Sequence, residues 1–482
     1  MGLSSSKPEE PLLDKPRLGR RLSYNSAAMA FGAYPDQTNM CEPTINSAAY
    51  FDTCPTVAAL IPLANQILQY ERCSSIPIGT DGANDWQCKY VNAEPSQMIR
   101  TIQVSSDEEL HEAIEEGMST TCRRENLPWW EFVRIENSNG DSVVMIRVDH
   151  WIGDGLSLVT LMEQILTLAD GVTPIPPIIP ESMSNKFKRK LGLVTKISMF
   201  FKAIYYFIVV LALPTGKYDD DTHFGKSMNS KMIYTWKRKL VKFESMPLSF
   251  IKSLKSEMNV SINDVMFAAL GGAIRRLNIA NECDLTANRG EKNKAIQCRA
   301  LMPVAFPRPK SETEDKTKVL RNKWVFVSSD FGVGVKDCVE RIRYVNGNMN
   351  TFKKSPLPAV QLWVQQTLPP KLPVKVAKQL VFDSISRHSV IFSNVPGPQG
   401  ACALGGQVCK EVQMYFNNLV PQVGILSYNG TVFMNINLDC EKCVGGELIG
   451  HYFAQELCEL GDKLQISVPE NIVKKAGELL ID

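Results

Sequence analysis

One of the five histidines in this chain lies where a catalytic base could work. His150 follows residues 142–147, whose β-branched and apolar side chains predict a buried strand. After it come Gly153 and Gly155, and then apolar residues at the spacing of an amphipathic helix. A strand, a tight turn with histidine and a helix hold an imidazole at the mouth of a site. The alternative is a structural histidine at the end of a strand.

The residues around His150 resemble a family motif. His150-Trp-Ile-Gly-Asp-Gly155 is similar to the His-His-x-x-x-Asp-Gly motif of the wax ester synthase/diacylglycerol acyltransferase family, within the larger group of CoA-dependent acyltransferases. Three further segments match in the same order. Residues 127–131 resemble its Pro-Leu-Trp segment, Asn263-Asp264 its Asn-Asp motif, and residues 393–398 its Asn-Val-Pro-Gly-Pro block. The resemblance spans roughly residues 39–465.

The chain departs from the family at one motif position. The family usually has a second histidine just before the catalytic one, where this chain has Asp149. Alternation along the strand would point Asp149 and His150 to opposite faces, so the base would be retained. The replacement leaves substrate preference open.

The resemblance implies an α/β (α+β) fold of the chloramphenicol acetyltransferase-like type, with the active site between two lobes. The polar helix expected at 107–118 and the Asn429-Gly430 hairpin fit an α/β pattern in both halves. The sequence divides into four expected parts. They are a flexible leader (1–38), an N-terminal lobe with His150 (39–173), a linker (174–230) and a C-terminal lobe (231–482).

The chemistry that the resemblance implies is O-acyl transfer from acyl-CoA to an alcohol. The products would be wax esters from long-chain fatty alcohols, triacylglycerol from diacylglycerol, or both. His150 would remove the hydroxyl proton and return it to the CoA thiolate. Because a thioester is already activated, we expect direct transfer, with acyl-CoA as a substrate and with neither a cofactor nor a metal.

Two residues after His150 have alternative roles. Asp154 either orients the imidazole as a triad aspartate does, or turns away and holds the loop with an arginine, as the resemblance implies. We favour the second role. Gly155 either lets substrate approach closely or starts the helix without a side-chain clash.

The two later motifs supply further candidates. Ser261 and Asp264 fit a helix capping box, which leaves the amide of Asn263 available to donate to an oxyanion. Ser393 and Asn394 precede a rigid Pro-Gly-Pro turn. They either form a structural corner or line the tunnel wall opposite His150.

Two other functions stay open at this stage. Residues 330–334, Asp-Phe-Gly-Val-Gly, resemble the Asp-Phe-Gly-Trp-Gly motif of soluble hydroxycinnamoyl-type acyl-CoA transferases, without its tryptophan. A non-catalytic lipid-binding relative is the other alternative, with Asp149 marking lost activity.

Composition excludes some partners. The chain has 53 Lys and Arg against 51 Asp and Glu, so no overall field favours nucleic acid. Its 13 cysteines have no framework spacing, which is typical of reduced thiols facing the cytosol. A lone Cys440-x-x-Cys443 lacks the second pair that a zinc site needs.

Two segments indicate membrane association. Residues 199–213 are apolar and interrupted by Lys202, which fits an interfacial or marginally spanning segment; the alternative is a buried core helix. Gly2 fits the myristoylation pattern, against a plain disordered leader. We therefore expect a cytosol-facing protein at a membrane or lipid droplet surface. The endoplasmic reticulum is expected first, with the plasma membrane or a lipid droplet as alternatives.

Overall fold

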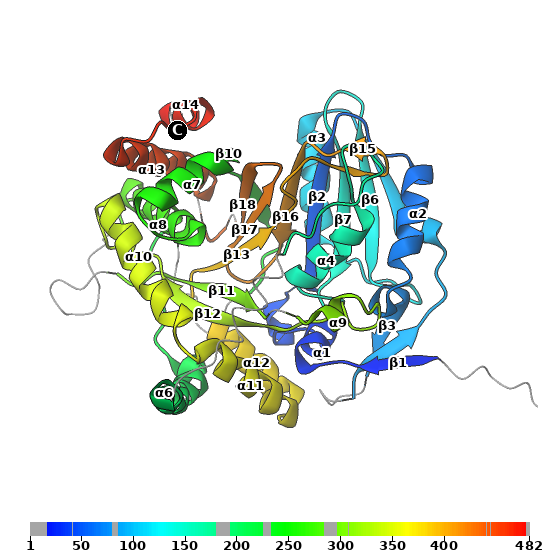
Figure 1. Cartoon of the computed structure of the whole chain (residues 1–482), viewed down its shortest axis with the longest axis horizontal. Coiled ribbons are helices and arrows are strands. Elements are labelled where there is room, and N and C mark those ends of the chain that lie inside the picture. Colours follow the sequence, from blue (N-terminus) through cyan, green and yellow to red (C-terminus); the bar gives the residue numbers. More distant parts are fainter. Residues whose placement is uncertain are drawn as a thin grey trace, which may run out of the picture.

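The computed structural model describes residues 17–40, 42–79, 85–179, 193–224, 233–283, 296–306, 308–439, 441–443 and 445–478. Two large β-sheets lie next to each other, and helices cover both (Figure 1). Each sheet forms the centre of one lobe. The expected α/β architecture with two lobes is therefore present.

The first lobe contains the strand that leads to His150. Its sheet has the order β16-β2-β7-β6-β5. Alternate residues of β7 face opposite sides: Val143 and Met145 pack with helix α3, and Val144 and Ile146 share a core with α2 and α4. Both faces are covered, which explains the continuous apolar run. The bounds are β2 (Thr44–Phe51), β5 (Ile99–Val104), β6 (Trp130–Asn137), β7 (Ser142–Asp149), β16 (Glu411–Phe416), α2 (Val57–Ile67), α3 (Asp107–Ser119) and α4 (Gly155–Ile165).

The second lobe is built on a sheet with the order β10-β18-β17-β13-β11-β12, with β9 beside β18. Its strands are β9 (Arg238–Lys242), β10 (Met246–Pro247), β11 (Arg299–Ala305), β12 (Trp324–Asp330), β13 (Val390–Pro396), β17 (Gln422–Tyr428) and β18 (Thr431–Asp439). The predicted hairpin is confirmed, because β17 and β18 are joined at Asn429 and Gly430, both with positive φ.

Helices cover both faces of this second sheet. Val390 and Phe392 of β13 pack into the core formed with α7, α8, α10, α13 and α14, whereas Ile391 between them packs towards α12. The bounds are α6 (Leu193–Ala212), α7 (Leu248–Glu257), α8 (Ile262–Ala280), α10 (Cys338–Lys353), α11 (Leu357–Thr367), α12 (Val374–Ile385), α13 (Ile449–Leu464) and α14 (Glu470–Gly477).

Segments from the second half of the chain pair with strands of the first lobe. The predicted C-terminal lobe of 231–482 is therefore wrong as one continuous range. Strand β16 comes from this range but pairs with β2 of the first lobe. A Cβ atom built at Gly424 of β17 would lie 2.3 Å from the carbonyl oxygen of Met414 in β16, so the two sheets meet closely there. β14 (Cys402–Leu404), beside β15 (Gln407–Val408), likewise pairs with β8 (Thr167–Leu168). Motif spacing carried no sign of this exchange.

The predicted leader of 1–38 is also wrong over its second part. Residues 17–38 contain β1 (Leu18–Arg21), which pairs with β4 (Gln87–Tyr90) beside β3 (Ser75–Ile78), and α1 (Tyr24–Phe31). Leu22, Ala27 and Ala30 are buried in the core of the first lobe. Helix α1 has only eight residues, too few for a clear helical period, so the sequence pattern predicts a flexible leader there. Gly2 lies outside the described residues.

Candidate active site

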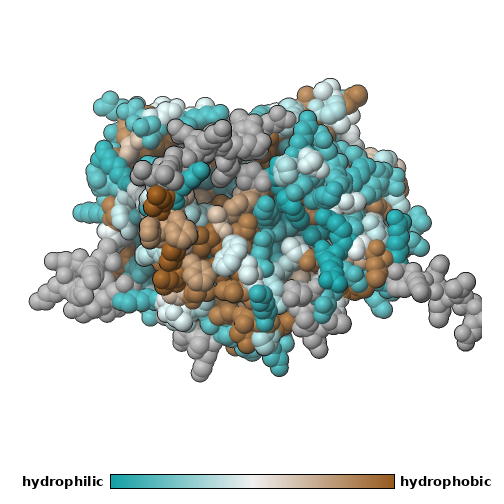
Figure 2. Space-filling view, turned by 60° about the horizontal axis from the view of Figure 1, so that its bottom comes forward, coloured by the Kyte–Doolittle hydropathy of each residue, from teal (hydrophilic) through white to brown (hydrophobic). Residues whose placement is uncertain are grey.

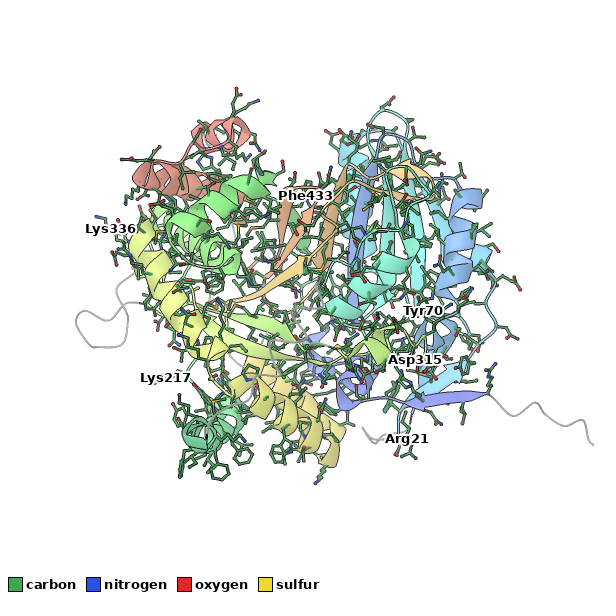
Figure 3. All side chains as sticks on the ribbon, in the orientation of Figure 1. Arg21, Tyr70, Lys217, Asp315, Lys336 and Phe433 are labelled. Carbon is green, nitrogen blue, oxygen red and sulfur yellow. The ribbon has the colours of Figure 1, made fainter. Side chains whose placement is uncertain are left out.

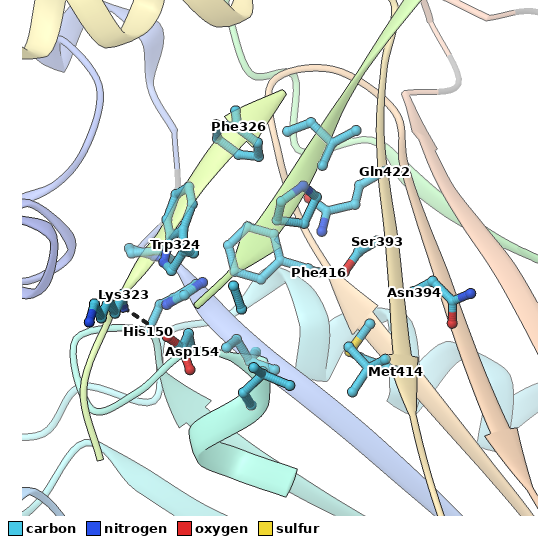
Figure 4. A pocket seen from close by; sticks show the side chains of 18 of the residues that line it. His150, Asp154, Lys323, Trp324, Phe326, Ser393, Asn394, Met414, Phe416 and Gln422 are labelled. Carbon is cyan, nitrogen blue, oxygen red and sulfur yellow. Dashed lines mark hydrogen bonds between the residues drawn. The ribbon is translucent and has the colours of Figure 1, made fainter. Parts of the chain in front are cut away.

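A cavity of about 1820 Å³ lies between the lobes, and His150 lines it. All five histidines fall within the described ranges, and His150 is the one that lines this cavity. His388 and His451 instead bond backbone carbonyls inside the second lobe, and His111 pairs with Glu115. Aromatic side chains, among them Trp324 and Phe416, line the cavity near His150, with Asp154 and Lys323 also beside it (Figure 4).

His150 sits in the turn directly after β7. Its backbone N–H donates to the carbonyl of Pro43, and its ring contacts Trp324 and Phe416 at centroid distances of 5.9 and 5.6 Å. Nδ1 is buried and has no hydrogen-bond partner among the described residues. Burial lowers the pKa of His150 below 6.5, against weaker opposing effects of its own carbonyl and of Asp154. The imidazole is therefore neutral at physiological pH and able to accept a proton.

Buried donors from two other segments hold the turn in place. Arg72 donates to the carbonyls of Trp151 (2.7 Å) and Ile152 (3.1 Å), and Asn322 Nδ2 donates to the carbonyl of His150 (2.7 Å). Arg72 is only 3% exposed, and burial lowers its pKa to about 10, so it stays charged. Three consecutive carbonyls are thus fixed by side chains. Neither Arg72 nor Asn322 lies in a motif, and sequence reasoning missed both.

Asp149 is turned away from the cavity. Its carboxylate accepts from Arg123 Nε (2.6 Å) and from the backbone of Trp151 (3.0 Å), and it is fully buried. Arg123 in turn stacks on Trp129, 4.5 Å from the ring centroid, so the 127–131 segment supports the turn. The residue that replaces the family's first histidine therefore has a structural partner, and the imidazole of His150 is retained.

Asp154 holds the loop with an arginine, as in the role we favoured. Its side chain accepts from Arg308 Nη2 (2.6 and 2.8 Å), from the backbone of Lys323 (2.8 Å) and from Ser157 at the start of α4. No described hydrogen bond joins it to His150, so the triad alternative has no geometric support. The partner is Arg308, between two prolines in the sequence, where no periodic signal marked it.

The first and last motifs meet at the cavity. A Cβ atom at Gly155 would lie 3.3 Å from Val395 Cγ2, so the missing side chain allows β13 to approach α4. Ser393 and Asn394 line the cavity, and Figure 4 places them on the other side of the pocket from His150. This is the wall that the sequence predicted for them.

The Asn-Asp motif lies at the N-terminus of α8. The capping box of Ser261 and Asp264 is present, as predicted. Asn263 lines the cavity, and its Oδ1 accepts from Asn394 Nδ2 at 2.5 Å, which brings two motifs together.

Two lysines that sequence reasoning missed also line the cavity. Lys252 and Lys255 belong to α7, the helix that precedes α8 in the chain. Their spacing of three residues places them on one helix face, but lysines at such spacing are common on surface helices.

The described residues contain no group of three or more His, Cys, Asp or Glu side chains placed to hold a metal ion. Cys440 lies outside those residues.

Comparison with known proteins finds similar sequences over most of the chain. Residues 321–461 match the WS/DGAT C-terminal domain. Wax ester synthase/diacylglycerol acyltransferase 2 of Arabidopsis thaliana is 22% identical, over 79% of this chain and 83% of that protein.

Two solved structures have the same fold. The wax ester synthase/diacylglycerol acyltransferase of Marinobacter aquaeolei VT8 has a TM-score of 0.60 at 15% identity, covering 93% of this chain and 100% of that one. The starter condensation domain of rhizomide synthetase, in complex with C8-CoA, has a TM-score of 0.53 at 10% identity, covering 94% and 96%.

The fold is thus that of the two-lobe, CoA-dependent acyltransferases of the chloramphenicol acetyltransferase-like type. Residues 321–461 match the model of the wax ester synthase/diacylglycerol acyltransferase family, and the chain resembles members of this family over most of its length, as the motifs predicted.

The contribution of the Asn322 hydrogen bond to catalysis can be tested by substitution. Asn322→Ala removes the donor to the His150 carbonyl, so we expect kcat for acyl transfer to fall by about tenfold or more, which corresponds to about 1.4 kcal/mol. KM for acyl-CoA should change little, because Asn322 is not part of the cavity wall.

The matched control is Asn278→Ala. Asn278 is equally buried and donates to the Ile274 carbonyl, but inside α8 and away from the cavity. It should lower the thermal midpoint without lowering kcat per folded molecule. Full kcat in folded Asn322→Ala would show that the turn does not need this donor.

Proposed function

We propose that this protein is an acyl-CoA:alcohol O-acyltransferase that forms neutral lipid, either wax esters from long-chain fatty alcohols or triacylglycerol from diacylglycerol. The main support is one observation: a neutral imidazole, His150, in the wall of a largely apolar cavity between two lobes. A hydroxyl acceptor needs a base near neutral pH, and a long alkyl chain needs apolar walls. The names of the related proteins point to the same two products.

In the proposed mechanism both substrates occupy the cavity at once. The neutral imidazole of His150 takes the hydroxyl proton as the alcohol oxygen attacks the thioester carbonyl, giving a tetrahedral oxyanion. The oxyanion collapses, the C–S bond breaks, and the CoA thiolate takes the proton back from the imidazolium. No cofactor or metal takes part, because acyl-CoA is an activated substrate.

We assign oxyanion or substrate contact to the amide pair at the N-terminus of α8. Since Asn263 Oδ1 accepts from Asn394, the Nδ2 group of Asn263 keeps its donors for another partner. A donor of this kind contributes about 3 to 4 kcal/mol to transition-state binding in other enzymes. Ser393, which precedes Asn394 on β13, adds a hydroxyl group to this wall.

The CoA part of the donor would bind to the lysines of the cavity wall. Lys252 and Lys255 of α7 line the cavity, and so does the start of α8, where backbone N–H groups also favour an anion. The phosphates of CoA would meet these charges while the thioester reaches inwards. The likeness to a condensation domain in complex with C8-CoA agrees with an acyl-CoA donor.

We further propose that the protein works at the cytosolic face of a membrane. Both products and the acceptor are poorly soluble in water, and segment 199–213 is apolar. The endoplasmic reticulum is the proposed site, with the plasma membrane or lipid droplets as alternatives. Myristoylation of Gly2 would add a weak second attachment.

The proposed function is tested by lipid analysis. The chain is expressed in cells that lack neutral lipid synthesis, with fatty alcohol supplied or withheld. Wax ester that depends on added alcohol, or triacylglycerol without it, is the expected result. Absence of both lipids from cells that contain the folded protein would contradict the proposal.

Removal of the proposed base, His150, should lower the rate of ester formation by a predictable factor. His150→Ala should lower the rate of ester formation by about 10² to 10⁴, the range for loss of a general base, and leave the thermal midpoint within a few degrees. His111→Ala, at a surface histidine on α3, is the matched control and should keep full activity. Normal turnover by folded His150→Ala would rule out the mechanism.

The proposed binding of CoA phosphates by Lys252 and Lys255 can be tested separately. Lys252→Glu combined with Lys255→Glu should raise KM for acyl-CoA by about tenfold or more and leave KM for a short alcohol unchanged, since only the donor carries phosphates. Lys474→Glu on α14, away from the cavity, is the control for the change in charge. An equal rise in both KM values, or in neither, would remove the lysines from the donor site.

A further inference from the structure

Helix α6 carries seven exposed large apolar side chains among the described residues. Within the described residues, Lys196–Thr215 is the one stretch long and apolar enough to cross a membrane, with a mean hydropathy of 1.9. Phe200, Phe201 and Tyr205 are 62%, 65% and 62% exposed. Figure 3 shows the side chains of α6 projecting from one corner of the molecule. The remaining exposed apolar side chains of α6 are Ile197, Ile204, Ile208 and Leu211.

The opposite side of α6 is packed against the enzyme. Tyr206, Phe207 and Val210 belong to a cluster with Val364 of α11 and Val327 of β12. Phe207 also lies 6.0 Å from Trp363 of α11, between ring centroids. The helix therefore lies along the second lobe, and crossing a bilayer would require it to leave this packing.

The apolar surface continues onto the neighbouring helices. Trp363 of α11 and Val376 of α12 are 56% and 45% exposed. Figure 2 brings this side forward and shows apolar side chains gathered into one brown area. We call this area, made by α6, α11 and α12, the apolar face.

The charged residues on the elements of the apolar face are mostly lysines. Lys196 and Lys202 are exposed on α6, and Lys371 and Lys375 lie at or next to the start of α12. Helices α6 and α11 and the turn η6 (Pro369–Lys371) contain no acidic residue, and α12 contains one, Asp383. Aromatic and apolar side chains with a lysine rim are the pattern of a helix that lies in an anionic membrane interface.

From this geometry we propose that the apolar face docks flat on a bilayer surface that contains anionic phospholipid, with α6 in the plane of the interface. The occupant is the lipid headgroup and upper acyl region, and α6 does not span the bilayer. Helix α12 connects this face to the active site, because Lys378, Val381 and Ile385 line the cavity. The inference extends the proposed function by naming the surface from which a lipid acceptor would arrive.

Docking is measured with the purified full chain and vesicles, without substrates. Vesicles of phosphatidylcholine alone are compared with vesicles in which part of it is replaced by phosphatidylserine, and bound protein is sedimented. Phe200→Ser with Phe201→Ser and Tyr205→Ser should lower the binding constant by about tenfold or more. These side chains are exposed, so the thermal midpoint should not change. Val473→Ser, an exposed residue of α14, is the matched control.

The lysines are tested separately. Lys202→Glu with Lys371→Glu should abolish the preference for phosphatidylserine, since each basic residue contributes roughly fivefold at an anionic surface. Lys474→Glu should keep it. A charge variant that still prefers phosphatidylserine would overturn the assignment of anionic lipid.

Orientation is read from Trp363 fluorescence, as the difference between the wild type and Trp363→Phe. Bromine carried near the lipid headgroup should quench this signal more than bromine at the chain end. Stronger quenching from the chain end would mean deep insertion and would contradict flat docking.

Other outcomes are equally decisive. A dimer that forms without vesicles and is broken by the α6 variant would assign the apolar face to a second copy and overturn the proposal. Unchanged binding of that variant would do the same. Because no substrate is present, these results do not depend on the proposed reaction, and activity on a short soluble alcohol should survive in every variant.

Discussion

The whole site depends on hydrogen bonds that side chains donate to one irregular turn. Residues 150–152 follow a strand but pair with no neighbouring strand, so their carbonyls need other donors. Arg72, buried with its charge, supplies two of these donors and Asn322 supplies the third. A buried guanidinium without acceptors would cost several kcal/mol, so the turn and Arg72 stabilise each other. Asn322 comes from the segment before β12, which ties the catalytic turn to the second lobe.

Side-chain partners also keep the two nearby carboxylates away from the imidazole of His150. Asp149 is held by Arg123 and Asp154 by Arg308, both through close hydrogen-bonded ion pairs. Neither aspartate bonds to His150 among the described contacts, so no carboxylate keeps the imidazole protonated. Burial acts without a strong opposing charge and lowers its pKa. The two aspartates of the motif thus build a rigid frame around a neutral base, unlike a catalytic triad.

Local pattern made much of this fold and site predictable. The strand before His150, the cap of α8 and the Asn429-Gly430 hairpin all follow from residue order over a few positions. The exchange of β16 between lobes and the packing of residues 17–38 depend on contacts between residues far apart in the sequence, about 70 to more than 300 positions, which periodicity does not encode. The motifs predicted the site residues that they contain. They did not predict Arg72, Asn322 and Arg308, because the role of a buried cation or amide appears only when its hydrogen-bond acceptors are in place.

The central claim, that a neutral His150 takes the hydroxyl proton, is tested most directly by the pH dependence of kcat/KM for the alcohol. A base with a lowered pKa is unprotonated over most of the neutral range. The profile should therefore rise with a slope of one at acid pH and level off through an apparent pKa below 6.5. This limb should disappear from the residual activity of His150→Gln. A limb that titrates well above 6.5, or one that survives in the variant, would contradict the account.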